Sequence, residues 1–231
     1  EHDPFVVNFV LPNIERQAAS SINALAESID DFLDSKGYGS TTFTDDPEFS
    51  LDEAPIGEVD LTERAARVRA AAIELPVDQD PKVDALSTIV DDATAADGPG
   101  KVLVFSFFIH TVEYVARSLR QRGTRVAVIH GGVPEHERET LRRRFRLDRT
   151  DAEALDVLVS SEVGCEGLDF EFCDRMVNFD LPWNPMKVEQ RIGRIDRYGQ
   201  KAEKVFIYNL ITDGTVEDRV WFRCFDRLGV F

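Results

Sequence analysis

The feature that most constrains the fold is an alternation of short apolar runs and helix-like segments that begins at Lys101. The apolar runs lie at residues 102–106, 125–129, 157–160, 175–179 and 204–209, and the helical segments at about 111–122, 134–146, 185–198 and 216–228. Such alternation is typical of a parallel β-sheet whose strands are joined by crossover helices. Right-handed crossovers place every strand-to-helix turn at one edge of the sheet, where the ligands of such folds bind. The sequence therefore predicts an α/β fold with one ligand-binding edge.

The first hundred residues show a different pattern, with helical spacing and many acidic side chains. Apolar residues from Ile14 to Phe32 recur at threes and fours before Gly37, which predicts one amphipathic helix. Residues 38–60 are acidic and have no apolar period, which favours a loop, and residues 61–75 form a second helical stripe. A third helix is predicted to begin at Asp80-Pro81. We therefore expect an acidic helical connector at residues 1–76 and a lobe at residues 77–231.

The distribution of charge keeps nucleic acid among the ligands to consider, despite a formal net charge of −16. Residues 1–100 hold 22 acidic and 6 basic side chains, whereas residues 101–231 hold 21 of each, so the acidity belongs to the first part. The three cysteines show no C-x-x-C spacing and the four histidines are scattered, so we predict no metal site. No apolar window approaches 18 residues, and we expect a cytoplasmic protein without membrane contact.

Two motifs that suit phosphate binding flank the apolar run at residues 175–179. The first is Val157-Leu158-Val159-Ser160-Ser161-Glu162-Val163-Gly164-Cys165-Glu166-Gly167-Leu168-Asp169, in which hydroxyls and then glycines let bare backbone amides approach an anion. The second is Gln190-Arg191-Ile192-Gly193-Arg194-Ile195-Asp196-Arg197. On a helix, Gln190, Arg194 and Arg197 share one face, because they lie four and three residues apart. The second motif therefore predicts two fixed cations on a single surface.

These residues resemble motifs V and VI of the superfamily 2 helicase-like ATPases, and more narrowly those of the Swi/Snf type. The runs Asn178-Phe179-Asp180-Leu181-Pro182-Trp183-Asn184-Pro185 and Arg197-Tyr198-Gly199-Gln200 are similar to the bacterial branch of translocases that recycle RNA polymerase. The resemblance covers about residues 82–226. It implies that residues 77–231 are the helicase C-terminal, second RecA-like lobe of such a motor, a parallel sheet with helices on both faces. It also implies ATP-driven translocation along double-stranded DNA, a first RecA-like lobe in the same parent chain, and RNA polymerase as a protein partner to consider.

The resemblance assigns nucleotide-side roles to five residues. It identifies Arg194 and Arg197 as arginine fingers that reach the γ-phosphate of ATP held on the first lobe. A planar, permanently charged guanidinium suits the charge that develops on a transferring phosphoryl group. The resemblance also implies that Gln190 is a polar bridge near the nucleotide, that Asp169 lies beside the nucleotide, and that Gly167 forms a close backbone turn.

For these arginines the sequence leaves an alternative, a surface helix whose arginines pair with acids such as Asp196. Gly193 argues against that alternative, because a glycine inside a helix costs about 1 kcal/mol and needs a reason. A second group of arginines is compatible with a phosphate-tracking patch and equally with a solvated helix face that neighbouring glutamates partly neutralise. Its members are Arg138, Arg142, Arg143, Arg144, Arg146 and Arg149.

The resemblance assigns nucleic-acid contacts to five residues at predicted strand ends, namely Ser106, Gly131, Gly132, Ser160 and Ser161. Hydroxyls and amides commonly position a phosphate without reading base sequence. Alternatives stay open, because the two adjacent serines also suit a strand-end cap and a Gly-Gly pair before a helix also suits an ordinary loop. Glu162 departs from the arginine that many eukaryotic remodellers carry, so contacts specific to chromatin are not carried over.

The chain has no G-x-x-x-x-G-K-[ST] loop to cradle phosphates and Mg²⁺. We therefore expect ATP with Mg²⁺ to be bound mainly by the first lobe, and this chain, which begins without methionine, to be an inactive fragment of a longer enzyme. Two alternatives remain. The first is a non-catalytic nucleic-acid or protein-binding module that keeps the fold, although the retained arginines speak against it. The second is an RNA helicase lobe, which usually carries histidine at the position of Gln190.

Overall fold

The computed structural model describes residues 11–34, 70, 80–95, 99–182 and 184–228. Its centre is one sheet of parallel strands in the order β2-β3-β1-β4-β5. The strands are β1 (Val102–Phe105), β2 (Val126–Ile129), β3 (Val157–Ser160), β4 (Arg175–Asn178) and β5 (Phe206–Asn209). Each lies within a predicted apolar run, so the predicted α/β fold is confirmed.

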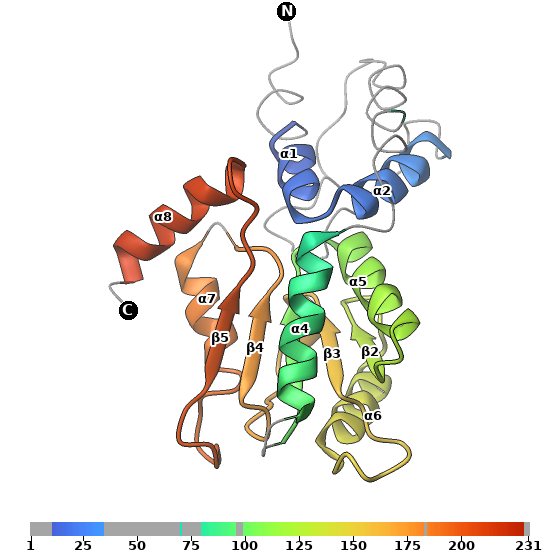
Figure 1. The fold of residues 1–231 in the computed structure, drawn as a ribbon, viewed down its shortest axis with the longest axis vertical. Coiled ribbons are helices and arrows are strands. Elements are labelled where there is room, and N and C mark those ends of the chain that lie inside the picture. Colours follow the sequence, from blue (N-terminus) through green and yellow to red (C-terminus); the bar gives the residue numbers. More distant parts are fainter. Residues whose placement is uncertain (1–10, 35–69, 71–79, 96–98, 183, 229–231) are drawn as a thin grey trace, which may run out of the picture.

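Helices cover both faces of the sheet, as predicted. One face packs against α4 (Pro81–Ala95) and α5 (Ile109–Gln121), and the other against α6 (Glu135–Arg146) and the short 3₁₀ turn η3 (Val163–Cys165). Figure 1 shows α4 in front of the strands and α6 behind them. The apolar side chains between the sheet and α4 and α5 are here called the first core, and those between the sheet and α6 the second core. Because side chains alternate along a strand, Val102 and Val104 enter the first core while Leu103 and Phe105 enter the second.

The predicted helix at residues 14–32 is two helices, α1 (Leu11–Ser20) and α2 (Ile22–Asp34). The break lies at Ser21, whose hydroxyl accepts a hydrogen bond from the backbone N–H of Ala24 and donates one to Asp80. Serine competes in this way with the helical backbone and favours the start of a new helix. The predicted closure at Gly37, the loop at 38–60 and nearly all of the stripe at 61–75 lie outside the described residues.

The first two helices dock over the carboxyl ends of the strands, at the top of Figure 1. The Ser20 hydroxyl lies 2.8 Å from the Asp180 carboxylate and 3.3 Å from the Thr111 hydroxyl, and the Thr212 hydroxyl donates to the carbonyl of Ala19 at 2.9 Å. The described part of the predicted connector therefore packs on the lobe through buried polar contacts, and the boundary at residue 76 stays a prediction.

A buried ion pair joins α4 to the last helix, α8 (Val216–Leu228). The Lys82 ammonium lies 2.7 Å from both carboxylate oxygens of Glu217 and 3.0 Å from the carbonyl oxygen of Phe179. Burial raises the pKa of the Glu217 carboxyl to about 7, and the Lys82 ammonium opposes that rise. This pair closes the sheet's first core at the end where the amino-terminal helices sit.

The helix predicted at residues 185–198 is shorter than expected. Helix α7 (Pro185–Ile192) begins at Asn184, whose side chain accepts from the backbone N–H of Met186, and it ends before Gly193. After that point the chain makes tight turns in which the N–H of Arg194 bonds to the carbonyl of Arg191 at 3.0 Å. The expectation that Gln190, Arg194 and Arg197 share one helix face is therefore wrong, because α7 ends at Ile192 and the chain then turns to bury Ile195 in the core on the α6 side of the sheet.

Candidate functional site

The two motifs meet on one side of the molecule, although their helical arrangement differs from the prediction. The Arg197 guanidinium forms an ion pair with the Asp169 carboxylate. Arg194 donates from its side chain to the carbonyl of Leu168 at 3.3 Å, and its own carbonyl accepts from the backbone N–H of Phe170 at 2.8 Å. The segment at residues 193–197, here called the arginine segment, therefore lies directly against the loop at residues 161–169, here called the glycine loop.

The exposed surface of this site consists of polar groups that suit an anion. The Arg197 side chain is 47% exposed, Gln190 is exposed and Arg194 is partly buried. Gly167 is exposed and has φ +75°, a backbone conformation that L side chains rarely adopt, so the loop presents bare backbone there. The Arg197 cation and the backbone turn at Gly167 are therefore both accessible to solvent.

Gly193 has no steric requirement within the described chain. Its φ is −60°, and an added Cβ would lie 3.5 Å from the carbonyl oxygens of Gln190 and Glu189, which is ordinary contact. Gly164 is different, because a Cβ there would lie 2.4 Å from the carbonyl oxygen of Ile129. The glycine loop thus needs Gly164 to pack on the end of β2, whereas no described contact explains the glycine at 193.

The three serines assigned to nucleic acid are all buried. Ser160 donates to the carbonyl of Ser161 at 2.8 Å, and the Ser161 hydroxyl accepts from the N–H of Gly164 at 3.1 Å. Ser106 donates to the Asp180 carboxylate at 2.5 Å. For Ser160 and Ser161 this geometry matches the strand-end cap that the sequence left open, and a nucleic-acid contact by the three hydroxyls stays a prediction.

Gly131 and Gly132 form an exposed turn after β2, next to the end of β3. The N–H of Gly132 donates to Nδ1 of His130 at 3.1 Å, and a Cβ on Gly132 would lie 2.9 Å from that ring. Of the five predicted nucleic-acid contacts, these two are the accessible ones, and their backbone lies beside the buried serines on the neighbouring strand.

Most arginines of α6 and the following turn bond within the chain. Arg144 donates to the carbonyl of Glu153, Arg146 pairs with Glu171, and Arg149 donates to the carbonyl of Thr94. These contacts favour the interpretation as a structural helix face over a phosphate-tracking patch. Arg142 belongs to the site, because its Nε donates to the carbonyl of Asp169 at 2.7 Å and holds the glycine loop from the side. The sequence offered no signal that separates Arg142 from its neighbours.

Sequence reasoning also missed Arg191, which is 1% exposed. Its guanidinium lies between the glycine loop, where it pairs with Glu162, and the end of β4, where it donates to Asn178 and to the carbonyl of Asp180. From the sequence alone, an arginine next to Gln190 would be predicted to be one more surface cation. Only the fold shows that it points inward.

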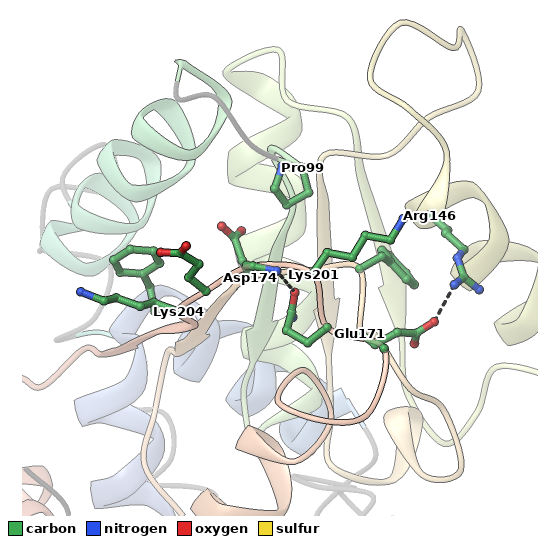
Figure 2. A pocket seen from close by; sticks show the side chains of 12 residues that line it. Pro99, Arg146, Glu171, Asp174, Lys201 and Lys204 are labelled. Carbon is green, nitrogen blue, oxygen red and sulfur yellow. Dashed lines mark hydrogen bonds and ion pairs between the residues drawn. The ribbon is translucent and has the colours of Figure 1, made fainter.

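A cavity of about 790 Å³ lies at the opposite edge of the sheet, near the amino ends of β1, β4 and β5. Figure 2 shows Arg146 paired with Glu171 on one side and Asp174, Lys201 and Lys204 around the rest. Positive and negative side chains alternate around it, which gives no preference for an anion. Among the described residues, no group of three or more His, Cys, Asp or Glu side chains is arranged to hold a metal ion, and no helix is long and apolar enough to span a membrane.

Comparison with known proteins finds helicase-like relatives of this chain. The chain is 30% identical over 223 residues to YqhH of Bacillus subtilis (strain 168), described as an uncharacterised ATP-dependent helicase; this covers 96% of the chain and 34% of YqhH. It is 39% identical over 125 residues to the RNA polymerase-associated protein RapA of Vibrio vulnificus (strain YJ016), covering 53% of the chain and 12% of RapA. The chain thus spans about a third or less of these relatives.

A solved structure supports the fold. The crystal structure of the C-terminal part of the Fun30 ATPase domain matches with a TM-score of 0.56 at 20% identity, over 87% of this chain and 63% of that one. The sheet and its covering helices are therefore the RecA-like lobe that the motifs predicted. The helicase conserved C-terminal domain family matches residues 81–199, which include β1 to β4, the glycine loop and the arginine segment. The chain belongs to this family.

Proposed function

We propose that this chain is the second motor lobe of an ATP-driven translocase that moves along double-stranded DNA. The observation that carries the proposal is the placement of Arg197, a half-exposed cation held by Asp169 next to the bare backbone turn at Gly167. Such a group can exchange its carboxylate partner for a phosphate without refolding the lobe. A fork of N–H donors then stabilises charge developing on the γ-phosphoryl group.

The residues of the lobe fit part of an ATP site. Arg194, Arg197 and Gln190 would face the phosphates, and Asp169 and Gly167 would lie beside the nucleotide. ATP brings the phosphoryl group and Mg²⁺ neutralises its charge, and in this proposal both are held mainly by the first RecA-like lobe of the parent chain. The lobe's own residues orient the fingers, through the contacts of Arg194 with Leu168 and Phe170.

The proposed partners follow from the same surface and from the relatives. In this proposal the exposed turn at Gly131 and Gly132 lets a DNA phosphate approach the backbone closely, because no side chain projects from it, and such a contact positions the duplex without reading its sequence. RNA polymerase is proposed as a protein partner, because RapA is RNA polymerase-associated and is 39% identical to this chain over 125 residues. A cytoplasmic location is part of the proposal.

The proposed activity is tested by comparing the parent protein with this chain. We expect the parent to hydrolyse ATP with Mg²⁺ and duplex DNA to raise that turnover, whereas this chain alone shows none, because it supplies only one side of the site. The measurement is phosphate release with duplex DNA, single-stranded DNA, RNA or no nucleic acid. Hydrolysis by this chain alone contradicts the half-site. A parent that is inactive under all four conditions points to the non-catalytic module, and stimulation by RNA alone points to an RNA helicase.

Replacing Gly193 by Ala tests whether a group outside this chain approaches the arginine segment. Because the lobe has room for the added methyl group, we expect the isolated lobe to be unchanged or about 0–1 kcal/mol more stable. We expect ATP turnover of the parent to fall about 3- to 10-fold, because a small displacement of reacting groups is costly. Melting temperature and turnover measure the two effects. Unchanged turnover would show that Gly193 serves only to end α7.

A further inference from the structure

The buried guanidinium of Arg191 joins three parts of the fold. Nε lies 2.8 Å from a Glu162 carboxylate oxygen, and Nη1 lies 2.8 Å from the Asn178 side-chain oxygen and 3.1 Å from the Asp180 carbonyl oxygen. The central carbon of the guanidinium lies 5.1 Å from the ring centre of Phe105. The glycine loop, the end of β4 and the end of β1 therefore all meet at this side chain.

Burial makes these contacts hard to exchange for water. The Arg191 side chain is 0% exposed, whereas the Arg197 side chain in the arginine segment is 47% exposed. A charge removed from solvent depends on its partners, because an unpaired buried charge is strongly unfavourable. Arg191 is therefore fixed in place, while Arg197 is free to change partners.

Glu162 and Arg191 lie between the predicted nucleic-acid contacts and the arginines proposed to face ATP. Glu162 directly follows Ser160 and Ser161 at the predicted nucleic-acid edge. Arg191 lies beside Gln190 and two residues before Gly193, where the arginine segment begins. A shift of the glycine loop on DNA binding would therefore pull on α7 through a buried ion pair.

We infer that Glu162 and Arg191 are positioning residues that transmit nucleic-acid binding at the glycine loop to the arginine segment. The inference rests on the proposed function, since the fingers and the DNA contact belong to it. The Glu162–Arg191 pair works by making the loop and α7 move as one body. It also gives Glu162 a role that depends on its negative charge, because a cation at this position would face Arg191 as a like charge.

The test uses the parent protein with Glu162→Gln and Arg191→Lys, and Glu217→Gln as a matched control. The control also removes one partner of a buried ion pair, but that pair joins α4 to α8 and touches neither motif. We expect both test variants to lose about 5-fold or more of the stimulation of ATP turnover by duplex DNA, with the KM for ATP within about twofold. We expect the control to melt at a lower temperature and to keep the stimulation ratio.

Amide hydrogen exchange of the same proteins gives a readout that does not depend on ATP turnover. In Glu162→Gln we expect faster exchange both at residues 163–170 and at residues 193–197, because the two segments lose their shared anchor. In Glu217→Gln these segments should stay protected. An inactive wild-type parent overturns the proposed function, while exchange still tests the coupling. An active parent whose Glu162→Gln variant keeps its stimulation ratio and its protection overturns the inference, as does an equal loss in the control.

Discussion

Replacing Arg197 by Lys in the parent protein is expected to lower DNA-stimulated ATP turnover by about 10-fold or more, while ATP affinity stays near its original value. Lysine keeps the positive charge but loses the planar fork that meets two phosphate oxygens at once. Coulombic attraction to ATP therefore survives, whereas the geometry of the transition state does not. The measurement is turnover and ATP affinity, with melting temperature as the folding control.

The structure supplies a matched control for this substitution. Arg197 pairs with Asp169 at the surface, and Arg122 pairs with Asp84 in a similarly exposed position on the face covered by α4 and α5. Exposed pairs contribute about 0–1 kcal/mol, so neither Arg197→Lys nor Arg122→Lys should lower the melting temperature much. If Arg197→Lys leaves turnover unchanged, Arg197 is a structural surface arginine. If turnover and melting temperature fall together, it stabilises the fold.

Replacing Lys82 by Met should lower the free energy of unfolding by about 1–3 kcal/mol at pH 8 to 9, because the buried Glu217 carboxyl without its cation has to stay protonated at a pH where the wild-type group is ionised. The exposed pair of Arg117 with Glu27 provides the control, and Arg117→Met should cost about 0–1 kcal/mol. Denaturant unfolding of the chain measures both. If both variants lose the same free energy of unfolding, the burial of the Lys82–Glu217 pair does not contribute to stability.

The pH dependence of this loss follows from the raised pKa of Glu217. A carboxyl whose pKa in the folded state is about 7 binds a proton between its ordinary value of 4.5 and 7, so its contribution to stability falls as pH rises through that window. Removing Lys82 takes away the cation that favours the charged form, so the carboxyl stays protonated to higher pH. We therefore expect the difference between wild type and Lys82→Met to be small at pH 5 and to grow toward pH 8. A difference that does not change with pH would contradict this coupling.

Much of the sheet could be predicted from the sequence, because strands buried on both faces are continuous apolar runs. Val157, Leu158 and Val159 illustrate this, since they enter both cores and leave no polar position. The place of the glycine loop could also be predicted, because it follows β3 at the carboxyl edge of the sheet. Local pattern and parallel topology were sufficient for these features. The arginine segment follows α7 instead, and its contact with the glycine loop depends on where the fold places that helix.

Other features depend on tertiary contacts that a local pattern does not contain. The helical period of residues 14–32 continues through Ser21, and only the partner Asp80, 59 residues away, shows why the helix breaks there. Burial of Ile195 in the second core draws the chain out of a helix that its neighbours favour. The inward direction of Arg191 on α7 likewise depends on distant partners, since Glu162, Asn178 and the carbonyl of Asp180 surround its guanidinium.

The docking of α1 over the strand ends also bears on how the chain is made. Ser20 bonds to Asp180 across 160 residues, and Thr212 reaches Ala19 across 193. During synthesis the amino-terminal helices leave the ribosome long before β4 and α8 exist, so their polar anchors have no partners for most of translation. Contacts of such long range are formed late, since closing a long loop costs entropy before any contact is gained. We therefore expect α1 to be the last element to dock on the sheet. In a nascent chain that ends before residue 180, α1 should remain accessible to proteases.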